Sequence, residues 1–438
     1  MNMNICMNTR KYINILNKIN FNTNYNTNFN RLHLLRTKSV VIIRDILENI
    51  SIGNIEYFTI KHTNIENITL YLLKHSNKQS RNTNINQFIH RLKQNLIDHS
   101  EIKKFINFNN DVLGGFIDYL LKYSTNKEIQ YLVDIYSDLI VSKFIPINIQ
   151  TYILTYLKKY IVFDVTLDTS KINFKIYYKN TIDNHKLSVL ILKAFYTVRL
   201  YNKQHQTINI NIFLTPNKKC FPEYSFLGPS EINSGLTSFS VNNTICIYRE
   251  EEISKLIIHE MVHALNIDSM IYMNPLKETI EKQIKCNFNI SNSNKINLNE
   301  SFTETSAVII NSLINSILLD TDIDSIIDYE IKFSIAQCSN ILQFYNENSE
   351  QFFNGECLYL NSNKDWIEKT SVLSYFFLKL ANLHDIDFFI NEYMFKSQID
   401  IEKYYVNIKK NYKRIIFLKE RVNFDSSLRM TLYNLIYI

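Results

Sequence analysis

The sequence LIIHEMVHAL, residues 256–265, carries the pattern H-E-x-x-H inside an apolar run. On a helix, His259 and His263 project from one face, one turn apart, so both imidazoles can bind the same cation. Glu260 leans toward the same position and can take a proton from a metal-bound water. The alternative is a core helix that happens to carry two histidines. Because the chain has only ten His, the pattern favours a metal site.

A third ligand is predicted downstream, where residues 299–313 read as the polar start of a second buried helix. Glu300 and Glu304 are four residues apart on it, so both carboxylates share one face. One of them would bind the metal, while the other would hydrogen-bond the outer nitrogen of a ligating His and fix its tautomer. The alternative is a pair of solvated acids in a first helical turn, where the helix dipole favours negative charge.

An H-E-x-x-H helix followed by N-E-x-x-x-E on a second helix resembles the gluzincin branch of the zinc metallopeptidases. The resemblance implies one zinc ion held by His259, His263 and Glu300. It also implies that Glu260 is the general base. Glu304 would be the outer carboxylate, in place of the Asp common in thermolysin-like members.

The likeness covers residues 228–317 and leaves the rest of the chain unmatched. The overall character of the sequence is also similar to that of predicted metallopeptidases of large DNA viruses. The spacer between His263 and Glu300 is longer than in the best-known gluzincins. We expect an inserted loop over residues 274–297 to account for the difference.

Two other kinds of zinc site are excluded by the residues present. A metzincin needs Gly and His three and six residues after the second His, and those positions hold Asn266 and Ser269. Asp268 is one residue too early to be a third ligand of that type, and we interpret it as a helix-end or turn residue. No Cys or His cluster has zinc-finger spacing.

The stretch before the helix predicts a substrate edge. Residues 236–241 and 244–248 read as two strands, and in zincins an extended peptide adds to the exposed sheet edge beside the active helix. Asn233, Ser234 and Gly235 are the candidates for that edge, although these residue types also favour an ordinary turn.

Hydrolysis also requires a donor for the oxyanion. Tyr375 is the first choice because it lies on a predicted helix after the Glu300 helix; His384 and Tyr359 are the alternatives.

The order of elements predicts an α+β fold with a zincin-like catalytic domain. Residues 1–39 form a basic, Asn-rich segment that we expect to be poorly structured, and residues 40–158 a helical domain of unknown role. Residues 159–438 form the catalytic domain, with a small mixed-sheet lobe and a helical lobe around the zinc. The predicted elements are helices at 40–50, 87–97, 112–123, 129–144 and 186–201, and strands at 161–167, 172–178 and 207–215.

Composition limits the partners. Only six Gly, no P-loop and a modest net charge of +6 argue against nucleotide chemistry and give no reason to expect nucleic acid. No apolar stretch is long enough for a membrane span. Six cysteines without a pairing pattern suit a reducing compartment. We therefore expect a cytoplasmic protein, or an organelle-targeted one if the basic N-terminus is a targeting segment.

The sequence thus predicts a zinc metallopeptidase that acts on a peptide or protein substrate. Two alternatives remain, a non-catalytic binding protein with a zincin fold and a metal-dependent hydrolase of non-peptide substrates. An intact Glu260 between the histidines argues against the pure binder, which needs no base.

Overall fold

The computed structural model describes residues 13–19, 29–59, 145–203, 205–223, 226–238, 243–288, 290, 296–345, 353, 369–418, 422 and 427–433. The chain divides into two compact units. The first combines residues 1–56, 161–176 and 181–438, and the second combines residues 57–160 and 177–180. The predicted metal ligands all lie in the first unit.

A mixed sheet is the base of the fold, in the strand order β1-β3-β4-β5-β7-β6. Strand β5 pairs in parallel with β7, and β6 pairs antiparallel with β7, so β6 is the last strand of this path. The strands are β1 (Ser51–Ile52), β2 (Glu56–Thr59), β3 (Lys159–Leu167), β4 (Ser170–Tyr178), β5 (Thr207–Phe213), β6 (Gly235–Ser238) and β7 (Thr244–Ile247).

Alternating side chains explain why β3 and β4 form strands. Buried and half-exposed residues alternate along β3, and the buried rings of Phe163 and Phe174 stack with centroids 5.1 Å apart. Such period-two burial is what a sheet with one packed face requires. The predicted strands at 161–167, 172–178 and 207–215 are confirmed, with shifts of one or two residues at their ends.

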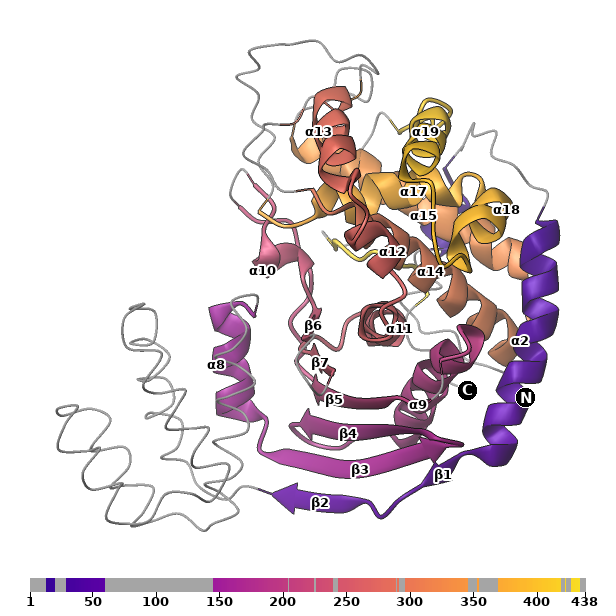
Figure 1. Cartoon of the computed structure of the whole chain (residues 1–438). Helices are drawn as coiled ribbons and strands as arrows, with labels where there is room; N and C mark the ends of the chain where they lie inside the picture. The colour runs from indigo at the N-terminus through magenta and orange to yellow at the C-terminus, as the bar shows by residue number, and fades with distance from the viewer. Residues whose placement is uncertain are drawn as a thin grey trace. The chain divides into compact units, whose positions relative to one another are not determined.

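Helix α11 (Ile253–Ala264) is the central helix of the first unit. It packs against β6 and β7 on one side and against α9 (Asn184–Leu200) and α14 (Leu298–Leu318) on others. All its residues are buried, including the polar Lys255, His259 and Glu260, so the helix is enclosed by the rest of the unit. In Figure 1 the strands lie beside and below α11, and α12 (Ser269–Tyr272) and α14 lie above it.

The other helices lie mostly after α11. They are α2 (Asn30–Asn49), α8 (Ile147–Tyr156), α10 (Pro229–Ile232), α13 (Lys277–Asn287), α15 (Ile323–Phe344), α17 (Lys379–Leu383), α18 (Ile386–Phe389) and α19 (Ile401–Tyr412), together with two π-helical segments, η1 (Leu373–Leu378) and η2 (Ile390–Met394). Aspartates begin three of the helices, where Asp183, Asp322 and Asp400 each accept a hydrogen bond from a first-turn N–H. The observed mixture of helices and sheet is an α+β fold.

Two sequence-based expectations differ from the structure, and three predicted helices are not tested by it. Helix α2 begins at Asn30, ten residues before the predicted start, so residues 30–39 are helical. The loop expected over residues 274–297 contains the helix α13. The predicted helices at 87–97, 112–123 and 129–144 lie outside the described residues.

In the second unit, the described part includes α8 and a group of aromatic rings. Phe58 stacks on Tyr160 with ring centroids 4.6 Å apart, and Tyr160 also contacts Tyr177. These rings give the described part of this unit an apolar cluster of its own.

The state of the cysteines differs from the prediction that they are unpaired. Cys286 takes part in a disulfide, whereas Cys220, Cys246 and Cys338 carry free thiols. The disulfide removes the cysteine argument for a reducing compartment. Within the described residues, none of the helices has both the length and the apolar character needed to span a membrane.

Candidate metal centre

The two histidines of α11 point their outer ring nitrogens at each other. His259 Nε2 and His263 Nε2 are 3.2 Å apart, and both side chains are buried. The helical spacing of four residues stacks the rings one turn apart, with centroids 4.9 Å apart. The structure therefore brings both predicted ligands to one point.

The Nδ1 atom of each histidine, on the far side of the ring from the meeting point, contacts a carboxylate. His259 Nδ1 lies 2.8 Å from Glu304 Oε2, and His263 Nδ1 lies 2.9 Å from Asp268 Oδ2. A carboxylate accepts, so each Nδ1 carries the proton and each neutral ring presents an Nε2 lone pair. Glu304 thus makes the contact with His259 Nδ1 that was expected of an outer carboxylate. Asp268 is the N-cap residue of α12, in agreement with its interpretation as a helix-end or turn residue, and its side chain also contacts the second histidine.

Glu300 completes the group from α14. Its Oε2 lies 3.4 Å from His259 Nε2 and 3.3 Å from His263 Nε2. Between Leu298 and Ser316 it is the only residue of the helix that is not buried. Tetrahedral ligation with metal–ligand bonds of about 2.1 Å separates neighbouring ligand atoms by about 3.4 Å. The three atoms therefore have the spacing of one metal site, and they form the candidate metal cluster of the described residues.

When both histidine rings are neutral, the contacts among these three atoms lack a proton to share. Glu300 Oε2 is buried and accepts no hydrogen bond from the described residues. If both Nδ1 atoms are protonated, both Nε2 atoms offer lone pairs to an oxygen that also offers lone pairs. Three converging lone pairs repel one another unless a cation lies between them.

The electrostatics of the site keep the Glu300 carboxylate ionised. Burial alone would favour the neutral acid of Glu300, but the neighbouring His263 and His259 hold the pKa of Glu300 well below its usual range. Burial lowers the pKa of His263, and the negative charges of Glu300 and Asp268 outweigh it, so that the pKa is raised well above its usual value. The opposite shifts show that Glu300 and His263 stabilise each other's charged forms when no metal is bound.

The predicted general base faces the last strand of the sheet. Glu260 is buried, and burial raises the pKa of its carboxyl although the two histidines oppose the rise. Thr237 Oγ1 donates to Glu260 Oε2 at 2.7 Å. A Cβ at Gly235 would lie 2.8 Å from Glu260 Oε1. Thr237 was not among the predicted site residues. Its only signal in the sequence is its position two residues after Gly235 on a strand.

Tyr375 lies beside the metal cluster, and its ring centroid is 6.0 Å from that of His259. Burial and the charges of Glu300 and Glu260 raise the pKa of Tyr375 well above its usual value, so the hydroxyl keeps its proton. The residue belongs to the π-helical segment η1, a kind of segment frequent at functional sites. His384 follows α17 and is not a member of the metal cluster. Tyr359 lies outside the described residues.

The three residues of the predicted substrate edge are placed differently from one another. Asn233 follows α10, where its carbonyl accepts from Arg249 Nε and its side chain accepts from Thr370 Oγ1. The Ser234 carbonyl accepts from Tyr248 N at 2.9 Å, next to the β6–β7 pairing. Gly235 begins β6 itself.

Buried ion pairs lie behind the metal cluster, and the sequence analysis did not foresee them. Lys255 Nζ lies 2.6 Å from Glu304 Oε1, and Lys219 Nζ lies 2.7 Å from Glu252 Oε2. Glu252 Oε1 also accepts the main-chain N–H groups of Met430 and Thr431. A single Lys inside the apolar run of α11 is the signal that could have suggested such a pair, because an unpaired buried charge is costly.

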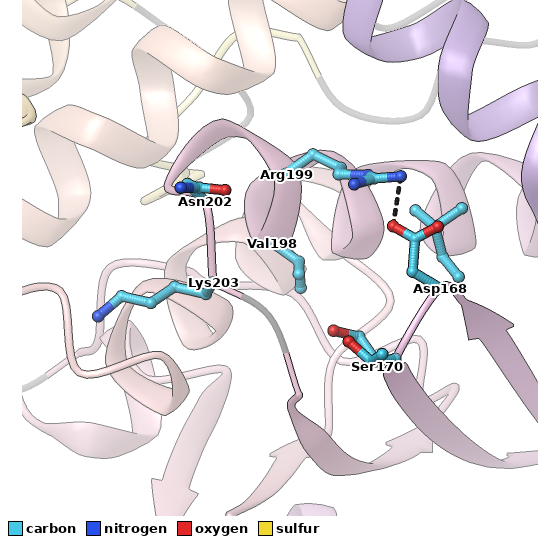
Figure 2. A pocket seen from close by; sticks show the side chains of 8 residues that line it. Asp168, Ser170, Val198, Arg199, Asn202 and Lys203 are labelled. Carbon is cyan, nitrogen blue, oxygen red and sulfur yellow. Dashed lines mark ion pairs between the residues drawn. The ribbon is translucent and has the colours of Figure 1, made fainter.

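A small pocket lies at the corner between β3, β4 and the end of α9 (Figure 2). Arg199 crosses it and pairs with Asp168 at 2.6 Å and with Asp45 at 2.9 Å. Its cavity of about 10 Å³ has room for no more than about one water. We interpret this corner as structural.

No family model matches the chain. No solved structure matches it either. Among curated proteins, the chain is similar to an uncharacterized protein of Acanthamoeba polyphaga mimivirus, with 28% identity over 222 residues. The alignment covers 47% of this chain and 53% of that protein, so the chain spans about half the length of the relative it matches. The function is therefore argued from the site.

Proposed function

We propose that the protein is a zinc-dependent peptidase of gluzincin type. The observation that carries the proposal is the meeting of His259 Nε2, His263 Nε2 and Glu300 Oε2 within 3.4 Å of one another. Two imidazoles and one carboxylate are a donor set typical of catalytic zinc, which keeps a fourth position for water or substrate. Rigid outer carboxylates behind both imidazoles support the same assignment.

The residues around the cluster supply the acid and base chemistry. Bound zinc would lower the pKa of a water ligand toward neutrality. Glu260 takes the proton of that water as it attacks a peptide carbonyl, and then gives the proton to the leaving amine. The raised pKa of the Glu260 carboxyl suits a group that must both accept and release a proton near neutral pH. Tyr375 donates its hydroxyl proton in a hydrogen bond to the oxyanion.

A peptide is the proposed substrate because the last strand of the sheet path lies beside the base. Strand β6 pairs with β7 on one side only within the path of described strands. An extended peptide can add to such an edge through main-chain hydrogen bonds, which brings its carbonyls past α11. Gly235, rather than Asn233, is the residue at which this edge begins.

Zinc content and peptide hydrolysis test the proposal together. We expect one zinc per chain by elemental analysis of the purified protein, and cleavage of peptides from a quenched-fluorescent library. Glu260→Gln is the matched variant, because it keeps the ligands but removes the base. It should bind zinc normally and lose roughly 10²- to 10⁴-fold in turnover.

Each of the other outcomes would indicate a different function for the protein. A chain without zinc after reconstitution would contradict the metal centre. Cleavage of esters or small amides, with all peptides intact, would indicate a hydrolase of non-peptide substrates. Stoichiometric zinc without any turnover would indicate a binding protein.

A further inference from the structure

We infer that Thr237 is a positioning residue for the general base, and that Gly235 leaves the room in which the base works. The inference rests on the proposed function and adds a specific device to it. Residues 235 and 237 are two apart on β6, so their side-chain positions lie on the same face of the strand. Both of those positions meet Glu260.

The hydroxyl of Thr237 holds one oxygen of the carboxylate. Thr237 Oγ1 lies 2.7 Å from Glu260 Oε2 and 3.1 Å from the main-chain oxygen of Glu260. A donor to a carboxylate makes one of the stronger hydrogen bonds in proteins. The bond joins the strand to α11 and fixes the rotation of the carboxylate about its last side-chain bond.

Gly235 leaves space for the other oxygen. A Cβ at this position would lie 2.8 Å from Glu260 Oε1 and 3.2 Å from its carboxyl carbon, closer than real Cβ atoms come to an oxygen. Within the described part of the chain, no side chain or N–H donates to Oε1. One oxygen of the base is therefore fixed by Thr237, and the other remains available to a water.

The hydroxyl can serve the base before and after it takes a proton. It has one proton and two acceptors within reach, the carboxylate Oε2 and the main-chain oxygen of Glu260. While Glu260 is ionised, the hydroxyl donates to Oε2. Once Glu260 has taken the water's proton, the hydroxyl can donate to the main-chain oxygen, and its own oxygen can accept from the carboxylic acid. No proton leaves Thr237 in either state.

Thr237→Val and Thr237→Ser separate this role from packing. Valine keeps the shape and removes the hydroxyl, whereas serine keeps the hydroxyl. With the best-cleaved peptide of the quenched-fluorescent library, we expect Thr237→Val to lower kcat roughly 10- to 100-fold, the range for losing a hydrogen bond to a charged group. KM should change by less than about twofold and zinc content should stay at one per chain, since no ligand is touched. Thr237→Ser should keep kcat within about threefold of wild type.

Thr244→Val is the matched control, because Thr244 lies in the neighbouring strand β7 opposite Ser238 and makes no contact with Glu260. It should leave kcat unchanged. Gly235→Ala is the second variant, and it should lower kcat with zinc retained because its methyl group displaces Glu260 Oε1.

The results that overturn the inference differ from those that overturn the proposed function. An active wild type with an unimpaired Thr237→Val, or a Thr237→Ser as impaired as Thr237→Val, would overturn the positioning role alone. Loss of zinc in Thr237→Val would also overturn it, because the residue would then support the metal site. A zinc-loaded wild type without turnover would overturn the proposed function, and this inference with it.

Discussion

Buried carboxylates have different partners on the two sides of α11. On the back side, which holds Lys255 and Glu252, the buried carboxylates of Glu304 and Glu252 each have an ammonium group of the chain within 2.7 Å. On the metal side, His259, His263 and Glu300 converge without a cation from the described residues. A buried carboxylate needs compensation in either place. The chain supplies it on the back side, and under the proposed function a bound metal ion supplies it on the other side.

Glu304 belongs to both sides, because its Oε1 meets Lys255 and its Oε2 meets His259. The lysine charge and the hydrogen bond from the histidine outweigh the effect of burial and hold the pKa of Glu304 well below its usual range. The position of His259 is thereby tied to an ion pair on the far side of the helix. Changes on the back side should consequently reach the metal through this one carboxylate.

Replacing Glu300 should have the largest effect and should be confined to the metal side. Glu300→Ala removes a ligand, so zinc affinity should fall by more than the roughly 10- to 100-fold that outer-position changes cause. Chelator competition measures the affinity, and urea unfolding of the zinc-free protein should show little change. Glu278→Ala on the exposed part of α13 is the control acid. If Glu304→Ala loses more zinc than Glu300→Ala, the roles of the two carboxylates are exchanged.

Replacing Lys255 should have the next largest effect, on stability. Lys255→Met leaves Glu304 buried without its ammonium partner, which should lower the free energy of unfolding by about 3–5 kcal/mol. Urea unfolding measures the change. Lys403→Met is the matched control, because its ion pair with Glu392 is exposed and should contribute little to stability.

A double variant sharpens the same comparison. Lys255→Met combined with Glu304→Gln removes both charges, so it should recover part of the lost stability. Additive losses would mean that the two side chains do not compensate each other, and the contrast between the two sides of α11 would then be wrong.

Asp268 should have a smaller effect, on the second histidine alone. Asp268→Asn keeps an acceptor for His263 Nδ1 but removes the charge behind it, so zinc affinity should fall roughly 10-fold, at the lower end of the range for outer carboxylates. Asn299, which donates to Asp268 Oδ2, should keep the new side chain in place. An affinity equal to that of wild type would show that only the Glu304 side orients the ligands.

The sequence predicted the parts of the site that depend on local spacing. His259 and His263 lie four apart on one helix, and Glu300 and Glu304 lie four apart on another, so helical geometry places each pair correctly. The partners that come from distant segments could not be predicted in this way. Lys219, Met430 and Thr431 reach the back side of α11 only through the tertiary fold, and Thr237 depends on the register of β6 against α11.

Lys193 offers the smallest but most specific test, because it is a buried ammonium with neutral partners. Its Nζ donates to Asn311 and Asn315 at 2.5 Å and 3.0 Å and also to Ser254 of α11, and the described residues give it no carboxylate. Burial lowers the pKa of Lys193 from 10.5 to about 7. Between these values the unfolded chain holds one proton more than the folded chain, so stability should rise with pH, by up to about 1.4 kcal/mol per pH unit. Below pH 7 both states hold the proton, and the cost of burial is fully present.

Lys193→Met should remove that slope. Urea unfolding at pH 7, 8 and 9 should show wild type gaining stability relative to Lys193→Met at each step, while exposed Lys403→Met runs parallel to wild type. Equal slopes for wild type and Lys193→Met would mean that three neutral oxygens keep the ammonium charged up to pH 9. In that case a buried ammonium on the back side of α11 does not need a carboxylate partner. The Lys255–Glu304 pair would then be explained by the need of His259 for a fixed hydrogen-bond acceptor, and not by charge compensation.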